Sequence, residues 1–358
     1  MDPFNIHILI KFLALIFILA FCFFLSINIF KDKNDITSVK YQKPTKETKK
    51  AERKSSLEPQ YLTVLLWNWP FGVRFDLDVC LSKYGISNCR VTADHSMYDT
   101  ADAVVFHYSD LNGNPNNLPQ RKRPGKQYWV WYNMEPPENC GGLEKFNSMF
   151  NLSLSYRKDS DIFIPYGYLQ FVAEPQDYMI PIKSKLAAWV VSNWNPNLER
   201  VKYYEKLKKY LTIDIYGKHH MPIEKNDHYS IIYQYKFYFA FESSLHTDYI
   251  TEKLFGNSFN TGTVPVVMGP PREIYEQFIP PNSFIHVDDF KTAEDLANYL
   301  KYLDQNDEVY RSYFIWRKHY RVVSNDVYSK PCCAVCDKIA GINRSFRVVT
   351  NLHKWFWS

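Results

Sequence analysis

The segment from Tyr235 to Lys253 offers the clearest chance of chemistry in this chain. A predicted strand ends in the carboxylate of Glu242, and a predicted helix then opens near Thr251, with Glu252 and Lys253 in its first turn. Free N–H groups at a helix start attract anions, Lys253 adds a positive charge, and Glu252 is placed to accept hydrogen bonds from hydroxyls of a ribose or a sugar. These residues predict a nucleotide-diphosphate site. An ordinary helix with an acidic first turn fits them equally well.

The signatures of several common enzyme classes do not occur in the sequence. There is no G-x-G-x-x-G loop and no G-x-x-x-x-G-K-[ST] loop, and only 12 of the 358 residues are glycine. The hydrolase patterns G-x-S-x-G and H-E-x-x-H are also missing. Two Asp-x-Asp triplets, 76–78 and 159–161, offer oxygen ligands for a divalent cation, but this pattern is short and weakly specific. We therefore predict no metal site.

The N-terminal region predicts a membrane anchor. Residues 12–30 carry no charge, and a helix of this length spans the hydrocarbon core of a bilayer. We predict a cytoplasmic tail at 1–11, a transmembrane signal anchor at 12–30 and a stem at 31–60. A cleaved signal peptide is the weaker alternative, since no small-x-small cleavage site follows. The lysines of the stem favour the opposite orientation by the positive-inside rule.

Cysteines and glycosylation patterns favour an oxidising, lumenal compartment, and we give them more weight than the charge rule. Asn151 and Asn343 each begin an Asn-x-Ser acceptor pattern. Six cysteines follow the apolar segment, and six cysteines allow fifteen pairings. They are Cys80, Cys89, Cys140, Cys332, Cys333 and Cys336.

The rest of the chain alternates short apolar strands with helices. This alternation predicts α/β architecture, with parallel sheets covered by helices on both faces. Two series in tandem indicate two Rossmann-like domains facing a cleft, at 61–180 and 181–330, with a C-terminal tail at 331–358. The predicted strands are 61–67, 103–107, 128–132, 186–191, 213–216, 237–241, 264–268 and 284–287, and the predicted helices are 197–211 (capped by Asn197), 249–259, one near Arg272, and 293–303.

Long runs across this globular part resemble the α1,3-fucosyltransferases of glycosyltransferase family ten, especially their vertebrate Lewis-X-forming branch. The resemblance implies a GT-B fold, with an N-terminal acceptor domain and a C-terminal donor domain. It also implies inverting transfer from GDP-β-L-fucose that needs no metal. The runs are 69–72, 156–162, 164–167, 189–196, 200–204, 235–269, 284–290 and 354–357.

The resemblance assigns the general base to Glu135, which follows the strand around Trp129 and Trp131. An inverting reaction needs a base opposite the leaving group, to take the proton of the acceptor hydroxyl. The family has Glu-Ser-Pro where this chain has Glu135-Pro136-Pro137, so the carboxylate is kept and the serine is replaced.

Donor and acceptor contacts are implied in the same way. Ser243 stands where the family has Asn, which puts donor affinity in question. His107 and Asp110 fall in the family's acceptor-reading motif, but Phe106–Asp110 matches neither the type 1 nor the type 2 form of that motif. The implied donor contacts are Arg200, Tyr238, Ser243, Tyr249, Glu252 and Lys253.

The resemblance also pairs two cysteines of the N-terminal domain with a C-terminal Cys-x-x-Cys, which returns the tail to that domain. Cys140 and Cys332 have no implied partner. The implied set is Cys80 and Cys89 with Cys333 and Cys336.

These observations predict transfer of L-fucose from GDP-fucose to O3 of GlcNAc in N-acetyllactosamine-type glycans of glycoproteins and glycolipids. The predicted location is the Golgi membrane, as a single-pass type II protein. The alternatives are fucosylation of the N-glycan core GlcNAc and a non-enzymatic lumenal GDP- or glycan-binding relic. We predict no essential metal or other cofactor, and no nucleic-acid partner, because much of the net charge of +5 sits in residues 31–54.

Overall fold

The computed structural model describes residues 61–224, 227–342 and 347–358. The predictions for residues 1–60 and for Asn343 lie outside these residues. Within the described ranges, no helix is both long and apolar enough to cross a membrane.

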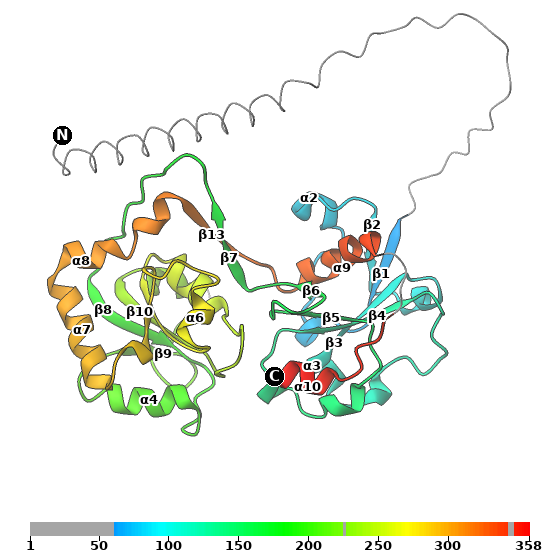
Figure 1. Cartoon of the computed structure of the whole chain (residues 1–358), viewed down its shortest axis with the longest axis horizontal. Helices are drawn as coiled ribbons and strands as arrows, with labels where there is room; N and C mark the ends of the chain where they lie inside the picture. Colours follow the sequence, from blue (N-terminus) through cyan, green and yellow to red (C-terminus); the bar gives the residue numbers. More distant parts are fainter. Residues whose placement is uncertain (1–60, 225–226, 343–346) are drawn as a thin grey trace, which may run out of the picture. The chain divides into compact units, whose positions relative to one another are not determined.

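The first sheet is six-stranded and entirely parallel, in the order β2-β1-β3-β4-β5-β6 (Figure 1). Its central strands β3 and β4 are buried along their whole length, which explains why they are apolar without alternation. The predicted strand at 103–107 is confirmed, and the one at 128–132 extends by one residue. The strands are β1 Leu62–Leu66, β2 Cys89–Thr92, β3 Ala103–His107, β4 Tyr128–Asn133, β5 Leu152–Ser155 and β6 Ile162–Phe163.

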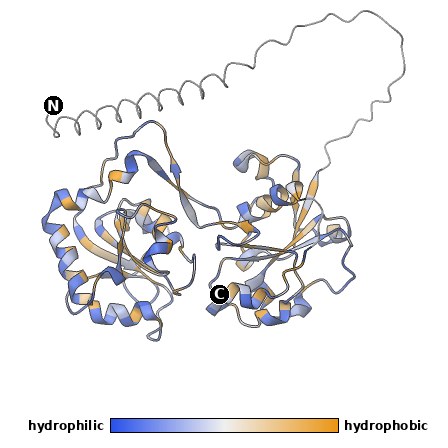
Figure 2. Cartoon of the chain, in the orientation of Figure 1, coloured by the Kyte–Doolittle hydropathy of each residue, from blue (hydrophilic) through white to orange (hydrophobic). Residues whose placement is uncertain are grey.

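The second sheet is five-stranded and parallel, in the order β12-β11-β10-β8-β9. Along β10, Phe237, Phe239 and Phe241 enter one core layer, whereas Tyr238 and Ala240 enter the other. Both faces are therefore buried, and Figure 2 shows hydrophobic strands between helices with hydrophilic outer surfaces. The strands are β8 Lys185–Val190, β9 Asp214–Tyr216, β10 Tyr235–Phe241, β11 Val264–Met268 and β12 Ile285–His286.

A two-stranded antiparallel ribbon lies where the chain leaves the first sheet and where it returns. It pairs β7 (Gly167–Phe171) with β13 (Tyr320–Ser324), and Leu169 faces Val322 at its centre. Neither strand is predictable from local sequence, because their residues are mostly half-buried or exposed and show no apolar run.

The helices differ from the prediction mainly at their ends. Helix α7 begins at Ala293 as predicted, and Thr292 and Asp295 form a capping box. Asn197 was wrongly predicted as a cap: helix α4 begins at Glu199, after Leu198, and no side chain caps it. The helices are α2 Cys80–Tyr84, α3 Tyr108–Leu111, α4 Glu199–Leu207, α5 His228–Ile232, α6 Arg272–Tyr275, α7 Ala293–Gln305, α8 Asp307–Ser312, α9 Ser329–Gly341 and α10 Leu352–Trp357, with a π-helix at Lys253–Phe259 and short 3₁₀ turns.

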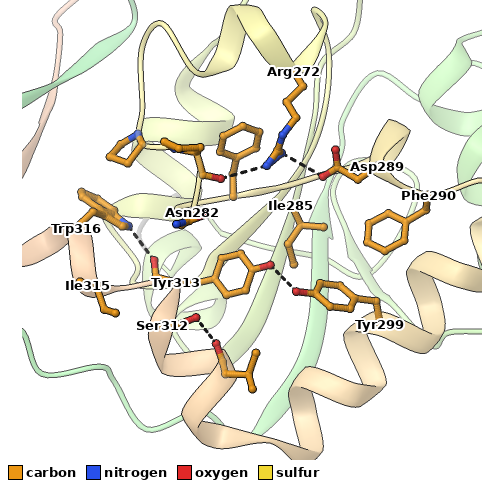
Figure 3. A pocket seen from close by; sticks show the side chains of 14 residues that line it. Arg272, Asn282, Ile285, Asp289, Phe290, Tyr299, Ser312, Tyr313, Ile315 and Trp316 are labelled. Carbon is orange, nitrogen blue, oxygen red and sulfur yellow. Dashed lines mark hydrogen bonds and ion pairs between the residues drawn. The ribbon is translucent and has the colours of Figure 1, made fainter. Parts of the chain in front are cut away.

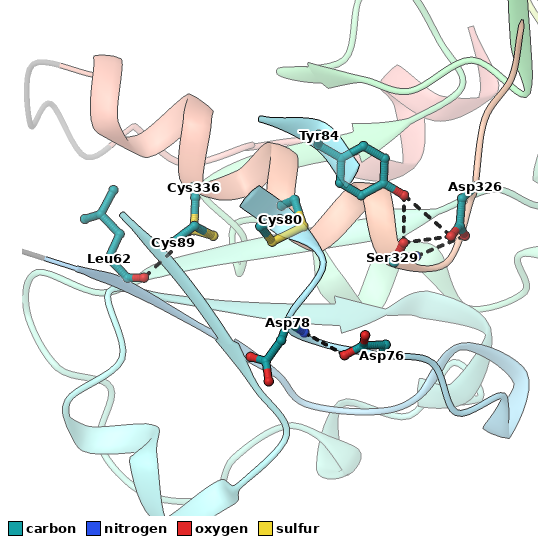
Figure 4. Close-up of a disulfide and its surroundings, with 10 residues drawn as sticks. Leu62, Asp76, Asp78, Cys80, Tyr84, Cys89, Asp326, Ser329 and Cys336 are labelled. Atoms are coloured by element: carbon teal, nitrogen blue, oxygen red, sulfur yellow. Dashed lines mark hydrogen bonds between the residues drawn. A yellow bond between two sulfur atoms is a disulfide. The ribbon is translucent and has the colours of Figure 1, made fainter. Parts of the chain in front are cut away.

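Helix α9 returns the chain to the first sheet, where it contacts β1 and β2. Two disulfides anchor it, with Cα–Cα distances of 5.3 Å for Cys80–Cys333 and 5.7 Å for Cys89–Cys336 (Figure 4). The disulfide set that the resemblance implied is therefore confirmed, and its pairing is resolved. Among the described cysteines, Cys140 and Cys332 are free and buried.

Asp326 lies just before α9 and accepts hydrogen bonds beside these disulfides (Figure 4). Lys83 Nζ and Ser329 Oγ each donate to its Oδ2 at 2.7 Å, and the N–H of Tyr328 donates to its Oδ1 at 2.9 Å. Partial burial disfavours the charged carboxylate, but these donors outweigh that effect and lower the pKa of Asp326 from 3.8 to about 2. The folded state therefore binds the ionised form preferentially.

We expect Asp326→Asn to lower the free energy of unfolding at neutral pH by about 2 kcal/mol. The stabilisation by the wild-type carboxylate is fully present above pH about 4 and is lost as the pH falls through about 2, because the folded pKa is the lower one. Thermal unfolding at pH 7 and at pH 3 measures it. A difference between the two proteins that does not shrink in acid would contradict this role of Asp326.

Candidate active site

A cleft of about 280 Å³ lies where the carboxyl ends of strands from both sheets come together. The loop after β4 contributes Pro136, Glu138 and Asn139, and the segment after β10 contributes Glu242 to Leu245. Residues on both sides of the α4 start complete the lining, among them Asn193 and Arg200. Ligands of open parallel sheets bind at this end of the strands, so the cleft is the candidate active site.

Glu135 lies beside this cleft, two residues after the end of β4, and is half-buried. Asn139 Nδ2 donates to its carboxylate oxygen Oε2 at 2.7 Å, and Asn133 Nδ2 donates to its backbone carbonyl at 2.7 Å. Tyr166 OH donates to the carbonyl of Met134 at 2.6 Å. The other carboxylate oxygen has no protein donor within the described residues, which suits a base that must reach a substrate hydroxyl.

Arg200 is buried on α4 and points into the cleft from the second domain. One guanidinium nitrogen donates to the carbonyl of Asn193 at 2.7 Å and another to that of Phe241 at 3.5 Å. Nε is buried without a partner among the described residues. Burial lowers the pKa of Arg200, although the charge of Glu242 opposes this effect. A buried guanidinium with an unused donor is suited to an anionic ligand.

Glu242, the carboxylate expected at the end of a strand, is the centre of a buried network. Its carboxylate accepts from the N–H of Thr251 at 2.8 Å and from Thr251 Oγ1 at 2.9 Å, and Lys253 Nζ lies 3.1 Å away. Burial raises the pKa of Glu242, with Lys253 opposing. Burial alone would lower the pKa of Lys253, but Glu242 and Glu252 outweigh it and raise that pKa well above its ordinary value.

The helix predicted at 249–259 begins later, at Lys253 after its N-cap Glu252, which lies within two residues of the predicted opening near Thr251. Asp248 has a left-handed backbone with a φ of 60°, and the helix is a π-helix that begins only at Lys253. The N–H of Thr251 is already bonded to Glu242. Full positive charges near the cleft come from the side chains of Arg200 and Lys253.

The remaining predicted donor residues surround this network. Ser243 lines the cleft and hydrogen-bonds with the buried Tyr249. The side chain of Glu252 is 57% exposed. Tyr238 has no exposed surface, and its hydroxyl accepts a hydrogen bond from Asn257 at 2.9 Å. It therefore packs beneath the site and does not line the cleft.

The two predicted acceptor residues form a pair at the end of β3. His107 Nδ1 lies 2.5 Å from Asp110 Oδ2, and the same carboxylate oxygen accepts from the N–H of Phe71 at 2.9 Å. His107 is completely buried, and its Nε2 has no partner among the described residues. Neither residue lines the cleft.

Carboxylates in both Asp-x-Asp triplets accept hydrogen bonds from groups of the protein. Asp159 accepts two hydrogen bonds from Arg157, whereas Asp161 accepts from the backbone and hydroxyl of Ser153. In the first triplet, Asp76 accepts from the N–H of Asp78 at 2.9 Å (Figure 4). No group of three potential metal ligands occurs in the described ranges.

Asn151, the predicted glycosylation site inside the described ranges, is buried. Its Oδ1 accepts from the N–H of Trp129 at 2.9 Å and its Nδ2 donates to the carbonyl of Arg347 at 2.9 Å. A glycan on Nδ2 would have to replace the contact with Arg347. Glycosylation at Asn151 stays a prediction.

A larger cavity of about 770 Å³ lies elsewhere, at the outer edge of β12 (Figure 3). Its polar side chains bond to one another: Arg272 donates to Asp289 at 3.1 Å, and the hydroxyls of Tyr299 and Tyr313 lie 2.9 Å apart. These four side chains therefore already have partners within the protein.

Comparisons with known proteins agree with this architecture. A family model described as "Fucosyltransferase, N-terminal" matches residues 59–167, and one described as "Glycosyltransferase family 10 (fucosyltransferase) C-term" matches residues 180–355. A crystal structure of an α1,3-fucosyltransferase with GDP-fucose matches with a TM-score of 0.55 at 18% identity, covering 83% of this chain and 96% of that one. The fold is therefore the GT-B-like α/β fold of glycosyltransferases.

Proteins with similar sequences identify the family within the glycosyltransferases. The chain is 44% identical over 297 residues to human 4-galactosyl-N-acetylglucosaminide 3-alpha-L-fucosyltransferase 9, covering 83% of this chain and 82% of the relative. It is 45% identical over 300 residues to human 4-galactosyl-N-acetylglucosaminide 3-alpha-L-fucosyltransferase FUT5, covering 82% and 80%. The chain belongs to glycosyltransferase family 10, the fucosyltransferases.

Proposed function

We propose that this chain transfers L-fucose from GDP-β-L-fucose to O3 of GlcNAc in N-acetyllactosamine-type glycans, with inversion at the anomeric carbon. The observation that carries the proposal is the cleft itself, where the Glu135 loop of one sheet lies opposite Arg200 and the Glu242–Lys253 network of the other. The names of the relatives, which specify a 4-galactosyl-N-acetylglucosaminide acceptor, support the acceptor class.

The reaction follows from the charges at the two sides of this cleft. Glu135 takes the proton from the acceptor hydroxyl as its oxygen forms a bond to the anomeric carbon of fucose. The bond from that carbon to the β-phosphate breaks, and its electron pair leaves with GDP. Arg200 and Lys253 stabilise the negative charge that develops on the diphosphate, so the proposal requires no metal or other cofactor.

The location belongs to the same proposal. We infer a single-pass type II protein of the Golgi membrane, anchored by residues 12–30, with the domain that carries Glu135 in the lumen. The two disulfides support an oxidising compartment. Protease protection of sealed Golgi vesicles measures the orientation, because a lumenal catalytic part is digested only after detergent is added.

The test is transfer by the full chain in detergent, with GDP-fucose and four acceptors: type 1, type 2, sialylated type 2 and N-glycan core. We expect transfer to type 2 acceptors, unchanged by a chelator. Transfer only to the core acceptor would select the first alternative, and binding of GDP without any transfer would select the relic. Loss of activity with the chelator would contradict the proposed metal independence.

A further inference from the structure

A single 3₁₀ turn, Pro137–Asn139, lies between the base and the second domain. Its last two residues carry polar side chains with different partners. Glu138 bonds to Ser244 of the second domain, and Asn139 bonds to Glu135. Both turn residues line the cleft, as does Ser244.

The contact between Glu138 and Ser244 joins the two domains at the cleft. Ser244 Oγ donates a hydrogen bond to the carboxylate oxygen Oε2 of Glu138, across 106 residues of sequence. Ser244 is buried, and it is the second residue after Glu242, whose carboxylate holds Lys253. The donor side of the cleft is therefore tied to the turn by this bond.

The contact between Asn139 and Glu135 joins the same turn to the base. The amide of Asn139 donates to Oε2 of the carboxylate at 2.7 Å and leaves the other oxygen for a substrate hydroxyl. A hydrogen bond to one oxygen fixes the orientation of the carboxylate. A general base needs this fixed orientation toward the acceptor hydroxyl during proton transfer.

The backbone of the turn is rigid, so it keeps the Glu138–Ser244 contact and the Asn139–Glu135 contact in a fixed relation to each other. Pro136 and Pro137 fix two successive φ angles, and the N–H of Asn139 donates to the carbonyl of Pro136 at 3.0 Å. The thiol of Cys140 donates to the same carbonyl at 3.3 Å. Burial raises the pKa of Cys140 to about 12, so the thiol keeps its proton.

We propose that Glu138, Ser244 and Asn139 are positioning residues that align the base with the donor site through this turn. The inference rests on the proposed function, since it assigns to these residues the alignment of Glu135 with the anomeric carbon of bound GDP-fucose. It predicts that breaking either contact slows the transfer step and leaves donor binding largely intact.

The test is a double-mutant cycle with the full chain, measuring kcat and the KM for GDP-fucose. Glu138→Ala and Ser244→Ala should each lower kcat about tenfold, with the KM changed by less than about twofold. Because both variants break one bond, the double variant should be no slower than the slower single variant. Asn139→Ala should lower kcat by a similar factor.

Conservative variants separate positioning from simple support of the fold. Glu138→Gln keeps an acceptor oxygen and Ser244→Thr keeps the hydroxyl, so each should retain kcat within about threefold of wild type. Glu205→Ala, which removes an exposed carboxylate on α4, is the matched control and should change neither constant.

Three results would overturn the inference: losses that multiply in the double variant, losses confined to KM, or conservative variants as slow as the alanine variants. Failure of the proposed function looks different, because the wild-type chain itself would then transfer no fucose to any acceptor.

Discussion

Glu135→Gln is expected to abolish measurable fucose transfer while the protein still binds GDP. An amide keeps the size of the side chain and an oxygen that accepts from Asn139, but it cannot take a proton from the acceptor hydroxyl. We expect kcat to fall by about 10³ or more and the Kd of GDP to change by less than about twofold. Product formation from GDP-fucose and calorimetric titration with GDP measure the two quantities.

The matched control is Glu144→Gln, which changes an exposed carboxylate in the same domain whose only close partner among the described residues is His353, 3.9 Å away. This variant should behave like the wild type. Full activity of E135Q would exclude Glu135 as the base. Loss of GDP binding together with activity would mean that the substitution disturbs the donor side of the cleft instead.

The second large effect concerns the buried pair of Glu242 and Lys253. The side chains are 1% exposed for Glu242 and 15% exposed for Lys253, so removing Lys253 leaves a buried carboxylate without its cation. Removing Glu242 leaves Lys253 with only the exposed carboxylate of Glu252, 3.2 Å away. We therefore expect Glu242→Gln and Lys253→Met each to lower the free energy of unfolding by about 3 kcal/mol. The double variant should lose less than the sum of the two. Thermal unfolding of the four proteins measures the coupling.

Donor binding distinguishes the two members of this pair. Lys253→Met should weaken GDP binding at least tenfold, alone or in the double variant, because it removes a positive charge from the diphosphate site. Glu242→Gln should keep GDP binding, since Lys253 remains. Lys202→Met, which breaks an exposed pair with Glu199, should alter neither stability nor binding appreciably. Additive stability losses, or GDP binding that does not depend on Lys253, would contradict this role of the pair.

The sheets were predictable from local patterns because most of their strands are buried apolar runs. Ala103–His107 and Val264–Met268 have the predicted bounds. The start of the π-helix was not predictable, because distant groups determine it. The carboxylate of Glu242 binds the N–H of Thr251, and Asp248 accepts from the N–H of Lys158, 90 residues away in sequence. The local helix propensities of residues 248–253 cannot predict these two long-range hydrogen bonds.

The site was only partly predictable, for the same reason. Glu135, Arg200 and Ser243 follow from family motifs, and the structure places Arg200 and Ser243 in one cleft with Glu135 beside it. Glu138 and Asn139 lie outside those motifs, and their partners are known only from the folded chain. For Glu242 the sequence showed a carboxylate at the end of a strand, a signal that a search for strand-terminal charges would find.

The return of α9 to the first sheet has a consequence for biosynthesis. The whole second sheet, from β8 to β12, lies in the chain between the strands of the first sheet and the helix that covers β1 and β2. During translation the first sheet is complete long before residues 329–341 leave the ribosome. Its apolar face, including Val64 and Val91, has to wait uncovered until Val335 arrives. A nascent chain arrested before α9 should therefore bind chaperones, whereas the completed chain should release them once both disulfides form.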